Sequence, residues 1–324
     1  MFGAGPRTKR TILPALSIVN PDIKIEFVTL SGKQFVSEDI ESDCFKFGSE
    51  IIDYSNYDLI IISVPPAQVS KILKSIGNVN NYKILIDTPV TREVYLNARK
   101  TNVKVMQDIK FLPFLDVVQK YGNINNVLMR FSGYEYHGVA LAKHLIDTKV
   151  VKSKRYRNSE RDELLIYFDK NKKVIIKNPR NYDIGYIEIN YQNDEKLVIG
   201  NKGTYKDFEN SSLYVDAEDL INKDEDFQKQ IHPLNNKINS TNFIESIHSF
   251  KLLGLSTMFF EAFNDRYEGL PSVSSCYDDY KITYTITIFN RIKWKIKKVL
   301  KSYNLIWVRV EVIYNSKIIG HLVL

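Results

Sequence analysis

The first half of the chain alternates short apolar runs with stretches of helical periodicity. The apolar runs lie at residues 23–30, 59–64, 83–86 and 103–106. The helical stretches lie at residues 8–19, 67–76 and 91–101. A strand that is covered on both faces has no polar side, as in LIIISV at 59–64. Strand, helix, strand with short connections predicts a parallel sheet with right-handed crossovers.

The second half has a different pattern, with many strand-like runs and few helices between them. The runs lie at residues 124–132, 163–168, 173–177, 184–191 and 195–199. Turn signals such as Asp169-Lys170-Asn171 separate them, which favours a mostly antiparallel sheet. Helices are expected at about 137–146, 240–263 and 285–303, and a hairpin in the last twenty residues that turns at Asn315-Ser316.

Length and composition favour two globular domains. At roughly 100–200 residues per domain, 324 residues correspond to two, and 44% hydrophobic with 26% charged residues excludes disorder. The change of pattern near residue 121 predicts an α/β domain at 1–121. It also predicts an α+β domain with an open, mostly antiparallel sheet at 122–324.

The net charge of +7 comes from one segment. Residues 281–301 contain seven Lys or Arg and no acid, and the rest of the chain is neutral. Nucleic-acid-binding proteins usually spread basic groups over a face of the fold, so no nucleic-acid partner is expected. The basic helix at 285–303 has an apolar stripe with Trp294. It could contact a membrane surface, but a packed helix with a solvated basic face is the favoured interpretation.

Cysteine and histidine usage restricts the compartment and the chemistry. Cys44 and Cys276 are far apart, which fits a reducing compartment and a cytoplasmic location. No apolar run is long enough for a transmembrane helix, and no signal sequence is visible. The five histidines show no metal-ligand spacing, so no metal site is expected.

A glycine-rich turn opens the first helix. Gly3, Gly5, Pro6, Arg7 and Thr8 form the run G-x-G-P-R-T, in which Thr8 takes the place of a third glycine. Glycines let the backbone approach a pyrophosphate, whose charge then lies at the helix N-terminus. A dinucleotide-binding turn is the functional interpretation, and an ordinary glycine-rich turn is the alternative.

The turn follows an unusually short strand. Only Met1 and Phe2 precede it, whereas the central strand of such a sheet has about five residues. We therefore expect either that the native chain begins a few residues upstream, or that this form leaves the flanking strands without a partner, is unstable and binds dinucleotide poorly.

The end of the second strand indicates which dinucleotide is bound. An acid normally holds the ribose 2′-hydroxyl at that place, but here Ser31 and Lys33 follow the strand. A hydroxyl and a cation suit a 2′-phosphate better, so NADP is expected to bind at least as well as NAD.

Three further segments resemble the Gfo/Idh/MocA oxidoreductases, the relatives of glucose–fructose oxidoreductase and inositol dehydrogenase. The segments are DLIIISVPP at 58–66, IDTPV at 86–90 and VMQDIKFLP at 105–113, and the resemblance covers about residues 2–145. It implies a Rossmann-type domain followed by an open-sheet domain. It also implies an NAD or NADP cofactor, and a sugar, polyol or sugar-nucleotide substrate in carbohydrate or surface-polysaccharide metabolism. The implied cofactor contacts beyond the turn are Ser63, Val64, Pro65, Pro66, Asp87 and Pro89.

The same resemblance implies the catalytic candidates and one departure. Thr88 stands where the family has a Lys, and threonine is a poor base near neutral pH. His137 matches a place where the family presents a catalytic histidine, and imidazole titrates near neutrality. Lys110 matches a basic position near the substrate. The resemblance therefore implies an NAD(P)-dependent dehydrogenase or reductase, and the alternative is a dinucleotide-binding sensor or scaffold of impaired activity. Family members also suggest a homo-oligomer formed through the open sheet.

Overall fold

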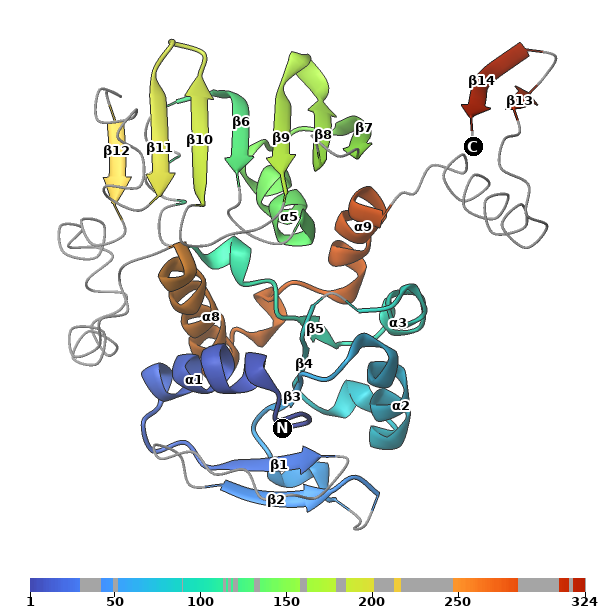
Figure 1. Ribbon diagram of the computed structural model, residues 1–324. Helices are drawn as coiled ribbons and strands as arrows, with labels where there is room; N and C mark the ends of the chain where they lie inside the picture. The colour runs from blue at the N-terminus through green and yellow to red at the C-terminus, as the bar shows by residue number, and fades with distance from the viewer. Residues whose placement is uncertain are drawn as a thin grey trace. The chain divides into compact units, whose positions relative to one another are not determined.

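The chain forms two compact units, Met1–Thr283 and Tyr284–Leu324. The computed structural model (Figure 1) describes residues 1–29, 42–48, 52–88, 90–112, 115, 118, 122–130, 135–157, 162–178, 185–200, 213–216, 247–284, 309–314 and 317–323.

The first sheet of the larger unit is parallel. Its strands are β1 (Ile25–Thr29), β2 (Ser42–Lys46), β3 (Ile60–Ile62), β4 (Ile84–Ile86) and β5 (Lys104–Val105). β2 pairs with β1, and β3, β4 and β5 pair in that order. Phe2 bridges to both Val28 and Ile62, which joins the two groups of strands. The resulting order is that of a Rossmann-type sheet, so the predicted parallel sheet is confirmed.

Residues 1–3 occupy the central place in this sheet. The Phe2 amide donates to the Ile61 carbonyl at 2.7 Å, and the Val28 amide donates to the Met1 carbonyl at 2.8 Å. Ser63 donates to Phe2 at 2.9 Å and Gly3 donates to Val28 at 3.1 Å. The facing groups of the two flanking strands therefore have partners here, and the expectation of unpaired backbone at this point is wrong.

Helices cover the first sheet as expected. They are η1 (Thr8–Ile12), a π-helical turn that runs into α1 (Leu13–Val19), then α2 (Pro66–Ile76) and α3 (Arg92–Ala98). Pro14 follows the π turn and cannot donate to the carbonyl four residues earlier, which accounts for the departure from α geometry. The Thr91 hydroxyl accepts from the Val94 amide at 3.4 Å and caps α3. Short 3₁₀ turns are η2 (Tyr54–Asn56), η3 (Val79–Asn81), η4 (Asp108–Phe111), η5 (Asp169–Asn171) and η7 (Tyr267–Gly269).

The second sheet has seven strands and is mostly antiparallel, as predicted. They are β6 (Ile124–Arg130), β7 (Val150–Arg157), β8 (Asp162–Phe168), β9 (Lys173–Lys177), β10 (Tyr186–Tyr191), β11 (Lys196–Gly200) and β12 (Leu213–Asp216). Their order is β12-β11-β10-β6-β9-β8-β7, and only the β6–β9 and β11–β12 pairs are parallel. Helix α5 (Glu135–Leu145) packs on this sheet (Figure 1), with Gly138 directly against Ile176.

The chain then returns to the first sheet through α8 (Ile247–Phe263) and α9 (Val273–Tyr284). Leu255, Met258 and Phe259 of α8 share a buried cluster with Leu13 and Leu16 of α1. Beyond α8, the Val105 amide of β5 donates to the Pro271 carbonyl at 2.7 Å. Both helices thus pack against the first sheet although they follow the second in sequence. The boundary at residue 121 stays a prediction.

Several elements had no sequence signal. The strands β2, β7 and β12 and the helix α9 were not predicted. β2 (SDCFK) and β7 (VVKSKRYR) are rich in polar and basic residues, so neither shows an apolar run. Helix α9 is largely polar and is held by a few buried residues such as Val273 and Cys276.

The smaller unit contains an antiparallel pair, β13 (Arg309–Tyr314) and β14 (Lys317–Val323). It confirms the predicted terminal hairpin, whereas the basic helix expected at 285–303 lies outside the described residues. Among the helices that the structure describes, none combines the length and apolar character that a membrane crossing needs.

Gly254 allows α8 to approach the turn η4, and this contact gives a stability prediction. A Cβ atom at Gly254 would lie 2.7 Å from the Asp108 carbonyl oxygen. We expect Gly254→Ala to lower the free energy of unfolding by about 1–3 kcal/mol, because overpacking outweighs the better helix propensity of alanine. Urea unfolding measures this. Gly269→Ala is the control, since nothing lies within 4 Å of its Cβ position. Equal or greater stability of Gly254→Ala would contradict the close contact.

Candidate functional site

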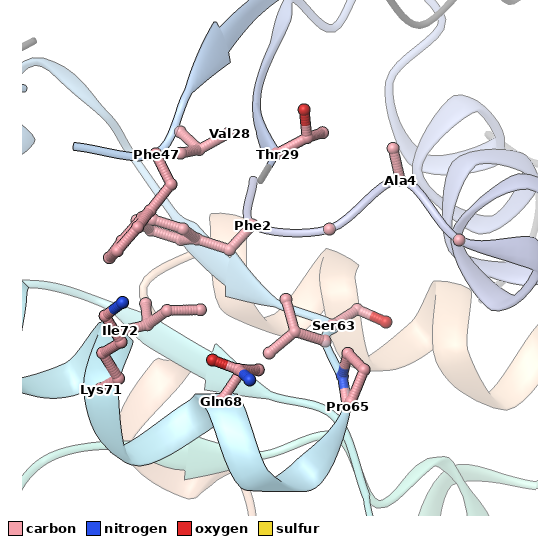
Figure 2. Close-up of a pocket in the computed structure, with 13 residues that line it drawn as sticks. Phe2, Ala4, Val28, Thr29, Phe47, Ser63, Pro65, Gln68, Lys71 and Ile72 are labelled. Carbon is pink, nitrogen blue, oxygen red and sulfur yellow. The ribbon is translucent and has the colours of Figure 1, made fainter. Parts of the chain in front are cut away.

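A cavity of about 260 Å³ opens at the carboxyl edge of the first sheet (Figure 2). Its lining is mostly apolar with a few polar groups, as in small-molecule sites. The lining residues are Phe2, Gly3, Ala4, Gly5, Val28, Thr29, Phe47, Ser63, Val64, Pro65, Gln68, Lys71 and Ile72. The carboxyl edge at the point where strand order reverses is where ligands bind in open α/β sheets.

The two glycines of the turn have different roles. Gly3 has φ +96°, and a Cβ there would lie 2.0 Å from the Ser63 carbonyl oxygen, so the backbone itself requires glycine. A Cβ at Gly5 would meet nothing within 4 Å. The Thr8 hydroxyl donates to the Gly3 carbonyl at 3.2 Å and closes the turn. Gly3 is therefore needed for folding, whereas Gly5 leaves open space beside the cavity.

Asp87 organises the polar groups next to this turn. Its Oδ2 accepts from the Ser63 hydroxyl at 3.0 Å and pairs with Arg7 Nε at 3.3 Å. Its Oδ1 accepts from the Thr88 amide at 2.9 Å. The carboxylate thereby holds the Arg7 guanidinium beside the glycine turn, with the Arg7 side chain still about one-third exposed.

The structure thus brings together most of the predicted cofactor contacts. Gly3, Gly5, Ser63, Val64 and Pro65 line the cavity. Arg7, Thr8 and Asp87 form the polar cluster beside it, while Pro66 begins α2 and is exposed. Pro6 lies within the turn. Ser31, Lys33 and Pro89 lie outside the described residues.

The predicted catalytic residues lie apart from the cavity. Thr88, Lys110 and His137, all among the described residues, do not line it. The Thr88 hydroxyl donates to the Met106 carbonyl at 3.4 Å. His137, on the first turn of α5, is only 4% exposed, and its Nδ1 lies 3.6 Å from Asp108 Oδ1 of η4. Asp108 is fully buried, and within the part of the chain that the structure describes neither of its carboxylate oxygens accepts a hydrogen bond.

A second buried polar group lies beside Asp108. Gln107 donates to Asp279 Oδ2 at 2.8 Å and accepts from the Cys276 thiol at 3.4 Å. Lys143 of α5 donates to the other Asp279 oxygen at 2.6 Å. Burial raises the pKa of Cys276 to about 11, partly offset by the nearby charge of Lys110. Cys276 is therefore a thiol at neutral pH and not a nucleophile, and this group links α5 and α9 to the first sheet.

Several cavity residues had no recognised signal in the sequence. Gln68, Lys71 and Ile72 lie on one face of α2, and their i, i+3, i+4 spacing could have indicated a shared face. Phe47 follows β2, and the polar sequence of β2 did not predict a strand. Asp108, outside the cavity, had no distinct signal either, since Gln107 and Lys110 are also polar in the segment VMQDIKFLP.

The arrangement can bind a ligand that carries an anion and a flat apolar group. The helix start and Arg7 supply positive charge, and the apolar walls supply contact area. The described residues contain no cluster of three or more His, Cys, Asp or Glu side chains placed to hold a metal ion.

Comparison with solved structures decides the fold. A dehydrogenase from Chromobacterium violaceum superposes with a TM-score of 0.59 at 11% identity, over 93% of this chain and 97% of that one. Levoglucosan dehydrogenase in complex with NADH and levoglucosan superposes with a TM-score of 0.53 at 13% identity, over 87% and 93%. The chain has the fold of these dehydrogenases. The expected architecture, a Rossmann-type domain followed by an open-sheet domain, is thereby confirmed. No protein-family model and no curated protein matches the sequence.

The buried Asp108–His137 pair gives a prediction about stability. We expect Asp108→Ala to lower the free energy of unfolding by about 1–3 kcal/mol, because the substitution leaves the polar Nδ1 of His137 buried without the carboxylate that faces it. The matched control is Asp278→Ala, which removes the partner of Lys281 from an i, i+3 pair on α9 whose aspartate side chain is 62% exposed. That change should cost about 0–1 kcal/mol. Equal effects of the two substitutions in urea unfolding would show that the buried pair is not formed.

Proposed function

We propose that the protein is an NAD(P)-dependent oxidoreductase that transfers hydride between a nicotinamide cofactor and a sugar, polyol or sugar-nucleotide substrate. The observation that carries the proposal is the cavity at the carboxyl edge of the first sheet, bordered by Gly3, Gly5 and the start of the first helix. The fold shared with two dehydrogenases agrees with it, since one of them is described in complex with NADH and levoglucosan.

The residues of the edge fit a dinucleotide. The open space at Gly5 admits a pyrophosphate against the backbone, and the helix start with Arg7 favours its negative charge. The cavity is smaller than the about 300–1,000 Å³ of sites that enclose a whole drug-sized ligand. It therefore suits one nucleoside half, and the rest of the cofactor would extend along Ser63 and Asp87.

Side chains of the protein would accept or donate the proton that accompanies hydride transfer. A bound nicotinamide supplies the hydride chemistry, and the protein supplies an acid or base for the substrate oxygen. We assign this role to His137, with Asp108 as the group that orients its ring through Nδ1. Lys110 and Thr88 would line the substrate side. Because His137 is buried, contact with a substrate requires α5 and η4 to move apart.

The same proposal covers cofactor preference, metabolic role, compartment and assembly. We propose NADP binding at least as good as NAD binding, from Ser31 and Lys33, and a role in carbohydrate or surface-polysaccharide metabolism. Both cysteines are free thiols, which supports a reducing, cytoplasmic compartment. A homo-oligomer through the open sheet is a further proposal.

A second candidate function is a dinucleotide-binding sensor or scaffold without turnover. Two observations favour it. Thr88 stands in place of the family Lys and donates to a backbone carbonyl. His137 is buried against Asp108. Cofactor binding would remain in such a protein because the cavity is separate from these residues.

One experiment separates the two candidates. Nicotinamide fluorescence is titrated with the full chain, and turnover is then measured over a panel of sugars, polyols and sugar nucleotides. Binding with turnover supports the oxidoreductase, binding without turnover supports the sensor or scaffold, and absence of binding excludes both.

Gly5 provides a test of the glycine turn that leaves the fold intact. We expect Gly5→Val to abolish NADH and NADPH binding, because the side chain would fill the space that the pyrophosphate needs, while the thermal unfolding midpoint changes little. Gly269→Val is the control, since it is exposed, has open space and lies outside the cavity. Unchanged affinity in Gly5→Val would show that the turn is structural.

His137 provides the test of proton transfer. We expect His137→Asn to lower turnover by about 10²-fold or more at unchanged cofactor affinity, because acid/base groups contribute about that much. Cofactor affinity and thermal unfolding are measured on the same variant, so that loss of the fold is recognised. Near-wild-type turnover would remove His137 from the mechanism.

A further inference from the structure

Two side chains from distant parts of the chain meet at one end of the cavity. Phe47 follows β2, and Lys71 lies on the second turn of α2. Figure 2 shows them at the end of the cavity opposite Ala4. The Lys71 ammonium nitrogen lies 5.3 Å from the centroid of the Phe47 ring, which is within the range of a cation–π contact. The contact holds a positive charge at this end of the cavity.

The described part of the cavity lining carries a positive charge and no negative charge. Among the described residues that line the cavity, Lys71 is the one charged side chain, and none is acidic. A site for NAD usually has an acid that accepts from the ribose 2′-hydroxyl. A 2′-phosphate instead carries a charge of about −1.5 to −2 at pH 7. The part of the cavity lining that the structure describes therefore fits a ribose 2′-phosphate better than a free 2′-hydroxyl at this end.

The same end offers a surface for a flat ring. Phe47 and Ile72 contribute apolar area, and the Gln68 amide of the same helix as Ile72 can both donate to and accept from a base edge. The flexible four-carbon stem of Lys71 lets its ammonium leave the ring face without a backbone change. A base can then contact Phe47 while the ammonium pairs with a phosphate on the adjoining ribose.

Building on the proposed function, we propose that Phe47 and Lys71 form the adenosine end of the dinucleotide site and that Lys71 favours NADP over NAD by pairing with the 2′-phosphate. Phe47 contacts the part that both cofactors share. Lys71 contacts the part that only NADP has. The two residues therefore differ in their predicted effect on selectivity.

Fluorescence titrations of the full chain with NADPH and NADH test this. We expect Lys71→Ala to weaken NADPH binding about tenfold or more and to leave NADH binding within about twofold, because only the charge-assisted contact is lost. The loss should shrink at high salt. Phe47→Ala should weaken both cofactors alike. Lys74→Ala is the matched control, since it is exposed on the same helix and does not line the cavity, and it should change neither affinity.

The titrations distinguish failure of the Lys71 assignment from failure of the proposed function. Binding of neither cofactor by the wild type would overturn the proposed function itself. Binding of both cofactors with a preference for NADH in the wild type would overturn the Lys71 assignment and the proposed affinity for NADP, and would leave the proposed oxidoreductase activity standing. Equal weakening of NADPH and NADH in Lys71→Ala, or no weakening, would overturn the Lys71 assignment alone.

Discussion

Pairing of the first three residues between β1 and β3 is the interaction on which the rest of the candidate site depends. The Met1 carbonyl accepts from β1, the Phe2 amide and carbonyl bond on the β3 side, and the Phe2 side chain is buried. This pairing brings Gly3 so close to the Ser63 carbonyl that no side chain fits. The cavity exists because the turn leaves the sheet at that place, between the ends of β1 and β3.

The sequence predicted the elements whose burial is periodic or complete. The strands β3 and β4 have no exposed face, and α2 buries Val69, Ile72 and Ile76 on one side, so their apolar patterns are plain. β2 and α9 are held by tertiary contacts that local sequence does not encode. The mixed pairing of the second sheet, with β6 parallel to β9, is likewise a property of topology and not of any single run.

The candidate site also has one part that the sequence could predict and another that depends on tertiary structure. The glycine turn and the segment around Ser63 could be predicted because backbone geometry demands particular residue types there. Lys71 and Phe47 could not, since their proximity depends on how α2 and β2 are placed around the turn. The burial of His137 could not be predicted from the sequence either. Its position on a helix could be expected, but the carboxylate that faces it belongs to Asp108 of η4, and the contact depends on how α5 packs against that turn.

The return of the chain to the first sheet has a consequence for biosynthesis. The Tyr267 hydroxyl accepts from the Ile84 amide and can donate to the Ile84 carbonyl, across 183 positions of sequence. At about 5–20 residues per second, a ribosome needs roughly 10–40 s to cover that interval. During this time β4 and β5 lack the neighbours that α8 and the segment at Pro271 provide. The N-terminal part would therefore emerge with an uncovered apolar surface, and a chaperone that binds apolar segments would have its longest opportunity there.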